Sequence, residues 1–124
     1  MSKKVRITVG ELVLTAELKE SETARRIWEA LPVEATGSLW GEEIYFDVPV
    51  EMGEEDPQAV VDVGDLGYWP PGKAFCLFWG PTPSSEGDEI RPASPVNVFG
   101  RITEDARLLG EAKTTHVKVE RLES

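Results

Sequence analysis

The sequence predicts a mainly β protein: a closed barrel or a sandwich of short antiparallel strands with peripheral helices. Runs of alternating apolar and polar residues recur along the chain, which is typical of strands with one buried face. Glycines and prolines separate these runs and indicate turns. Helical periodicity is confined to one clear segment and one short one. Together these features favour a strand architecture closed by few helices.

The first thirty residues indicate a hairpin followed by a helix. Residues 5–9 and 12–18 alternate, and the glycine-containing pair between them predicts a β-hairpin turn. Ser21 is a suitable N-cap, and apolar residues recur at helical spacing from residue 24 to residue 31. We expect this amphipathic helix to stop at Pro32.

Strand patterns dominate the remainder of the chain. Residues 33–40 and 43–48 predict a second hairpin that turns near Gly41, and residues 51–62 predict an acidic loop. Further strands are expected at 74–79, 96–102 and 115–122. Between the last two, Thr103 is placed to cap a short helix over residues 104–109 that ends at Gly110.

Length and charge limit the classes of function. At 124 residues the chain predicts a single domain, 1–124, that is long enough to bury its own core. Its formal net charge of −10 argues against nucleic acid and against anionic membrane surfaces as partners. No stretch fits a signal peptide or a membrane span, and a single cysteine excludes an internal disulfide, so a cytoplasmic protein is expected. The oligomeric state is left open, a homo-oligomer included.

Three features of the sequence are candidates for chemical sites. Nine acidic residues and no basic ones lie between Gly41 and Asp65, which raises the alternative of a Ca²⁺ or Mg²⁺ site. Their spacing matches no EF-hand loop, so we expect a solvated loop and no metal or other cofactor. His116, in the last strand, is expected to be exposed. Cys76 lies between two apolar residues and is expected to be an inert packing residue.

The segment from residue 64 to residue 80 is the most constrained part of the chain. Its Trp69-Pro70-Pro71-Gly72 turn predicts rigid backbone, with Gly72 supplying a positive φ, and leaves open whether either proline bond is cis. The turn is either purely structural or holds the Trp69 ring at the rim of a pocket.

The apolar strand that follows divides by parity into two faces. Ala74, Cys76 and Phe78 share one face, and the alternate residues share the other. Neither face is polar, so the outer one is either covered by another segment or lines an apolar groove.

The order of these elements resembles the cyclophilin fold. More closely, three blocks (residues 40–46, 64–77 and 90–98) resemble a small prokaryotic cyclophilin-like family of unknown function. The resemblance covers nearly the whole chain. It implies a closed eight-stranded antiparallel barrel whose ends are closed by one amphipathic helix and one short helix.

The same resemblance suggests a catalytic activity, but the residues that this activity requires are not matched in the sequence. Cyclophilins catalyse prolyl cis/trans isomerisation with an arginine and an apolar proline pocket. The resemblance places that arginine on residues 43–48, which contain none, and places the cyclophilin glutamine and pocket phenylalanine at Ala74 and Cys76. A divergent prolyl isomerase is therefore the alternative rather than the leading hypothesis. Cyclophilin-like domains also occur in bacterial complexes that process cyclic amides, so a subunit or partner role is a further alternative.

The leading hypothesis is a binding module with an apolar, aromatic-rimmed groove for a small molecule or peptide. The residues expected to line this groove are Tyr45, Phe46, Trp69, Cys76, Phe78 and Arg91. Arg91 would be the natural partner of a ligand carboxylate if it faces the groove.

Overall fold

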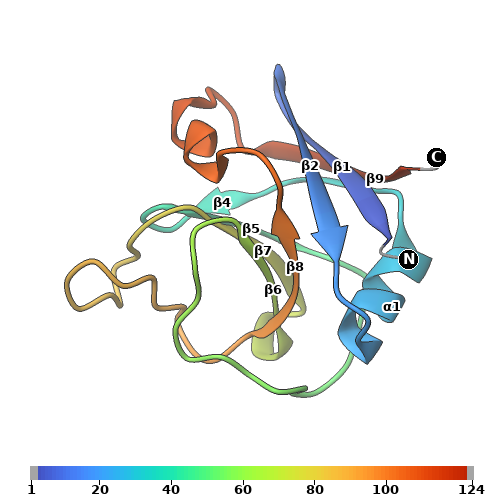
Figure 1. Ribbon diagram of the computed structural model, residues 1–124, viewed down its shortest axis with the longest axis horizontal. Helices are drawn as coiled ribbons and strands as arrows, with labels where there is room; N and C mark the ends of the chain where they lie inside the picture. The colour runs from blue at the N-terminus through green and yellow to red at the C-terminus, as the bar shows by residue number, and fades with distance from the viewer. Residues whose placement is uncertain (1–2, 123–124) are drawn as a thin grey trace.

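The structure is a computed structural model that describes residues 3–122. Over these residues the chain forms nine antiparallel strands, one α-helix and two short 3-10 helices (Figure 1). In chain order they are β1 (Lys4–Val9), β2 (Leu12–Leu18), α1 (Glu22–Ala30), β3 (Val33–Thr36), β4 (Ser38–Leu39), β5 (Glu43–Asp47), β6 (Asp65–Trp69), η1 (Pro70–Gly72), β7 (Ala74–Phe78), β8 (Asn97–Ile102), η2 (Ala106–Glu111) and β9 (His116–Leu122). The mainly β class predicted from the sequence is confirmed.

All nine strands belong to one sheet that curls into a nearly closed barrel. Their order is β3-β9-β1-β2-β8-β6-β7-β5-β4, so the two edge strands, β3 and β4, are consecutive in the sequence. Only Gly37 separates them. A Cβ on Gly37 would lie 2.6 Å from the backbone oxygen of Tyr45, so only glycine fits where the chain leaves β9 and joins β5. The strand expected at 33–40 is therefore two strands, and the barrel has nine strands rather than the expected eight.

The first hairpin and the amphipathic helix are as predicted. β1 and β2 pair antiparallel around Gly10, which has a φ of 62°. The Ser21 hydroxyl accepts a hydrogen bond from the backbone N–H of Ala24 (3.2 Å), and α1 ends at Ala30, before Pro32. The buried face of α1 packs against the barrel. This packing stabilises the helix, because an isolated helix of nine residues would not be stable in water.

Two local predictions in the second half are wrong. The sequence predicts no strand over residues 65–69, but they form β6, in which Leu66 and Tyr68 point into the barrel. The short helix is η2, and its N-cap is Asp105, whose carboxylate accepts from the backbone N–H of Arg107. Thr103 does not cap it, because its hydroxyl instead donates to the backbone oxygen of Thr15 on β2 (3.1 Å).

The apolar side chains form two separate clusters on the two faces of the sheet. Inside the barrel, Phe75 stacks on Phe46 at 4.9 Å between ring centroids and meets Phe99 edge-on at 5.1 Å. Outside it, the second cluster comprises Val61, Ala74, Cys76, Phe78, Ile90 and Val96. The long segments before β6 and before β8 supply the covering residues of this outer cluster. They lie on the side of the barrel away from β1 and β9 (Figure 1). The predicted division of the 74–79 strand into two apolar faces is confirmed.

Candidate functional site

A pocket of about 230 Å³ lies outside the barrel, between the outer face of β5, β6 and β7 and the segment that leads into β8. Its lining residues are Trp40, Glu43, Tyr45, Trp69, Cys76, Pro92, Ala93 and Val96. Strand alternation places the sheet residues there. Tyr45 and Cys76 are register partners on β5 and β7, and Gly67 is the partner of Cys76 on β6. A Cβ on Gly67 would lie 2.8 Å from Val96, so this glycine allows the covering segment to approach the sheet.

Trp69 is held in place from two sides. Its indole Nε1 donates a hydrogen bond to the Ser94 hydroxyl at 2.6 Å. Its ring lies against Gly72, where a Cβ would be only 2.6 Å from two ring carbons. Gly72 is therefore required by this close contact and not, as predicted, by a positive φ. The positive φ of the turn belongs to Lys73, at 51°.

The peptide bonds of this turn are trans. Pro70, Pro71 and Gly72 form η1, and the cis peptide bond among residues 3–122 is Leu31–Pro32.

Glu43 is the charged group in the pocket wall, and it is 5% exposed. Its Oε1 atom is buried without a hydrogen-bond partner among the described residues. Burial raises the pKa of Glu43 to about 7, while a contact with the Cys76 thiol acts in the opposite direction. At neutral pH this carboxyl is therefore poised between its acid and carboxylate forms. Perturbed titratable groups in clefts are typical of functional sites.

Glu43 is not among the site residues predicted from the sequence, because it belongs to a run of acids that indicates a solvated surface. Strand parity was the available signal, since Glu43 and Tyr45 are two residues apart on β5 and share a face.

Of the six side chains expected to line the groove, the structure brings Tyr45, Trp69 and Cys76 together. Burial raises the pKa of the Cys76 thiol, which fits an inert packing residue. Phe78 lies on the same outer face, but it is fully buried under the covering segment and does not reach the pocket. Phe46 points into the barrel and stacks on Phe75, because it alternates with Tyr45 on β5.

Arg91 also lies outside the pocket lining, although the next two residues belong to it. Its guanidinium Nη2 is 2.7 Å from Glu89 Oε2, and its Nε is buried without a hydrogen-bond partner. Its backbone is fixed by Ser85, whose hydroxyl accepts from Arg91 N (3.1 Å), and by Thr82, whose hydroxyl donates to Arg91 O. The expectation that Arg91 faces the groove therefore does not hold, because its side chain is directed to Glu89.

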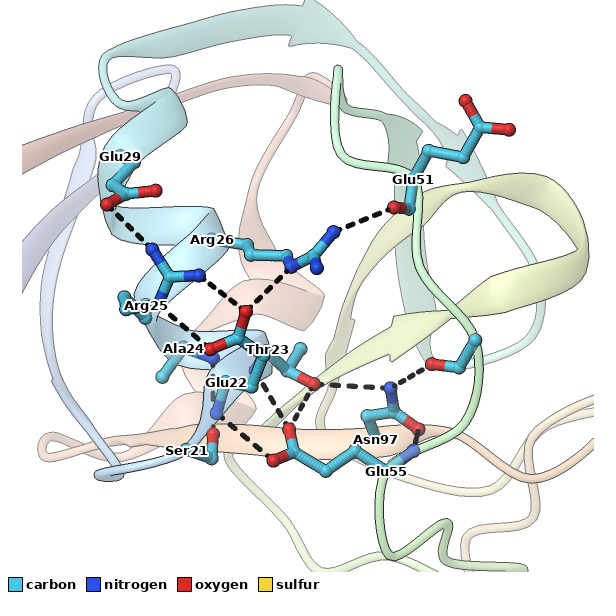
Figure 2. A network of polar contacts seen from close by, with 11 residues as sticks. Ser21, Glu22, Thr23, Ala24, Arg25, Arg26, Glu29, Glu51, Glu55 and Asn97 are labelled. Carbon is cyan, nitrogen blue, oxygen red and sulfur yellow. Dashed lines mark hydrogen bonds and ion pairs between the residues drawn. The ribbon is translucent and has the colours of Figure 1, made fainter.

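The acidic loop has a structural role at the start of α1. The Glu55 carboxylate accepts hydrogen bonds from the backbone N–H groups of Glu22 (3.1 Å) and Thr23 (2.8 Å) and from the Thr23 hydroxyl (2.6 Å), as Figure 2 shows. These bonds lower the pKa of Glu55. The buried Asn97 side chain joins the network by accepting from Glu55 N (2.9 Å) and donating to Gly53 O (3.0 Å). The loop thus caps the N-terminal helix end, where backbone donors are otherwise unsatisfied.

The other chemical candidates are dispersed. His116 is exposed, as predicted, and its Nε2 lies 2.6 Å from Glu34 Oε2, which lowers the pKa of Glu34. Within residues 3–122, no three or more His, Cys, Asp or Glu side chains gather as a metal-binding cluster. In the same range, no helix is both long and apolar enough to span a membrane.

The sequence and the fold are similar to those of known proteins. The model of the cyclophilin-like family matches residues 3–120. The chain belongs to the cyclophilin-like family. Among solved structures, it is similar to the solution structure of a hypothetical protein from Archaeoglobus fulgidus, with 44% identity and a TM-score of 0.80. That match covers 98% of this chain and 95% of the archaeal one. No curated protein matches the sequence.

In this cyclophilin-like chain, β5 is the strand on which the sequence resemblance implied the isomerase arginine. The residues that β5 directs to the pocket are Glu43 and Tyr45. The charge on this surface is therefore opposite in sign to the one that the resemblance implied.

Proposed function

We propose that this protein binds a small organic molecule, or a single side chain of a peptide, in the pocket between the outer face of β5, β6 and β7 and the segment that leads into β8. The observation that carries the proposal is Glu43. Native proteins rarely leave a buried polar atom unpaired, and each such atom costs about 1–3 kcal/mol. An unpaired carboxylate oxygen inside an apolar, aromatic pocket is explained if a ligand supplies the missing partner.

The form of the pocket supports the same proposal. Ligand sites typically combine apolar and aromatic walls with a few polar groups, as here. The volume of about 230 Å³ is below the roughly 300–1,000 Å³ usual for drug-sized ligands, so the ligand is small. The Trp69 ring is already held by Ser94 and Gly72. Because this side chain loses little conformational freedom when a ligand binds, the affinity is favoured.

Binding is favoured over prolyl isomerisation. Among the described residues, the pocket lining contains no guanidinium group that could hydrogen-bond to a twisting amide. A proline-isomerisation assay on a set of Xaa-Pro peptides should therefore give the uncatalysed rate.

The four tryptophans provide a direct test of binding. Trp40 and Trp69 line the pocket, whereas Trp28 lies on α1 and Trp79 belongs to the barrel interior. In a screen of small molecules followed by ¹H–¹⁵N NMR, a ligand of this site should shift the indole signals of the first pair. Trp28 and Trp79 are internal controls. A broad screen in which no compound moves Trp40 or Trp69, or moves all four signals equally, would refute the proposal.

A further inference from the structure

We propose that the pocket selects a small organic cation, a protonated amine on a compact apolar body, whose ammonium N–H groups bind the Glu43 carboxylate. This inference rests on the proposed binding function and names the chemical class of its ligand. Three independent features of the pocket support it: an unpartnered acceptor, aromatic walls, and surroundings without a competing cation.

The first feature is the acceptor itself. Glu43 lines the pocket and is 95% hidden from solvent. Its Oε1 has no partner at hydrogen-bond geometry among the described residues, and the Cys76 thiol beside the carboxyl is only a weak donor. An ionised carboxylate only accepts hydrogen bonds, so a ligand that satisfies it must donate. A charged N–H donor gives a shorter and stronger bond to a carboxylate than a neutral donor does.

The second feature is the aromatic wall. Trp40, Tyr45 and Trp69 come from three different segments and meet around the same volume. Aromatic faces attract cations through the ring quadrupole, Trp most strongly, and aromatic cages are a known means of binding substituted ammonium groups. Aliphatic walls alone would have served a neutral apolar ligand equally well.

The third feature is the electrostatic environment. The other titratable groups that line the pocket are Tyr45, on β5 itself, and Cys76 on β7, and of these the Cys76 thiol acts on Glu43. The covering segment contributes Pro92, Ala93 and Val96, and the β4–β5 turn contributes Trp40. None of these lining residues, all within the described part of the chain, is cationic.

The wider field of the protein acts in the same direction. Arg91, the cation that the sequence places nearest to this wall, is paired with Glu89. The formal net charge of −10 attracts cations to the surface.

The pocket also limits the size of the ligand. Its volume of about 230 Å³ equals that of roughly eight water molecules at about 30 Å³ each, which a single small ring with a short ammonium arm would fill. Benzylammonium, benzyl alcohol and benzoate are suitable probes, because they share one ring and carry charges of +1, 0 and −1.

The test measures the dissociation constant of each probe by NMR titration at pH 5.5, 7.0 and 8.5. Benzylammonium remains largely protonated over this range, whereas Glu43, with a pKa of about 7, changes from mostly acid to mostly carboxylate. Affinity for the cation should therefore rise with the ionised fraction of Glu43, by up to roughly 30-fold from pH 5.5 to pH 8.5. Calorimetry at pH 6 in buffers of different ionisation enthalpy should record the release of about 0.9 proton for each cation bound. Benzyl alcohol should show neither effect.

Two variants separate the carboxylate from the rest of the pocket. Glu43→Gln should abolish the pH dependence and reduce benzylammonium to the affinity of benzyl alcohol, while benzyl alcohol binding persists. Glu42→Gln is the matched control, since Glu42 is exposed and lies outside this pocket. It should behave as the wild type. If Glu43→Gln fails to fold, the pH profile and proton release of the wild-type protein decide the question alone.

The possible failures are distinguishable. Equal affinity for the cation and the alcohol at all pH values would overturn the ammonium inference and leave the proposed binding function intact. So would tighter binding at pH 5.5, which would mean that the protonated acid donates to the ligand. Preference for benzoate would also overturn the ammonium inference, because an anion is repelled by an ionised Glu43. If none of the three probes binds, the ammonium inference is refuted, and the broader screen of the four indole signals then decides whether the binding function fails with it.

Discussion

Replacing Glu43 by Gln should change how the stability of this protein depends on pH. Burial raises the pKa of Glu43 to about 7 in the folded chain, against an ordinary value of 4.5. Between these two values the folded state binds more protons than the unfolded state, so the free energy of unfolding falls as pH rises. The glutamine variant has no ionisable group at this position and loses that component of the pH dependence.

The magnitude follows from the two pKa values. Their difference, at about 1.4 kcal/mol for each pH unit, gives about 3 kcal/mol between pH 4 and pH 8. Urea unfolding followed by tryptophan fluorescence at each pH gives the free energy of unfolding by linear extrapolation. From pH 4 to pH 8, the free energy of unfolding of Glu43→Gln should rise by about 3 kcal/mol relative to that of the wild type. The free energy of unfolding of Glu42→Gln should follow the wild-type curve. Parallel curves for Glu43→Gln and the wild type would show that Glu43 ionises as easily in the folded state as in the unfolded one, and would refute the reasoning.

Three further predictions concern the cap, the turn and the thiol. Glu55→Gln should cost about 1 kcal/mol at pH 7 through the lost helix cap. In urea unfolding this cost should shrink as the pH falls through the lowered pKa of Glu55, because the wild-type carboxylate is then protonated as well. Gly72→Ala should move the Trp69 indole NMR signal and weaken probe binding, because its Cβ would collide with the ring. Gly53→Ala, where a Cβ would meet no atom within 4 Å, should do neither. The Cys76 thiol is buried with a raised pKa, so it should resist a thiol reagent at pH 8 in the native protein and react on unfolding in urea; rapid native labelling would contradict this.

Local patterns predicted those parts of the fold that local interactions determine. The first hairpin and α1 follow from alternation, helical spacing and the Ser21 cap, all of which act within a few residues. β6 was missed because Gly67 breaks its outer apolar pattern. The reason for that glycine is the approach of Val96, almost thirty residues away, which no local pattern shows. The ninth strand likewise depends on Gly37 lying between two distant partners.

The candidate site was predicted in part for the same reason. The alternation of side chains along the 74–79 strand identified its outer face correctly. The same alternation on β5 predicts that Glu43 and Tyr45 share the outer face and that Phe46 faces the barrel interior. The position of Arg91 could not be obtained in this way. It is set by hydrogen bonds that the Arg91 backbone makes with the Thr82 and Ser85 hydroxyls within an irregular segment, whose path depends on side-chain contacts rather than on a repeating pattern.

Strand β7 has a consequence for how the pocket can change over evolution. One of its faces is the wall of the barrel interior, around Phe75, and the other is the floor of the pocket, at Cys76. The strand that forms the pocket floor also packs into the hydrophobic core, so the floor is rigid. Substitutions on this strand that enlarge or reshape the pocket disturb a sheet that is packed on both sides. New ligand preferences should therefore arise more easily from the segment at Pro92 and Ala93, which can vary while the barrel behind it is left as it is.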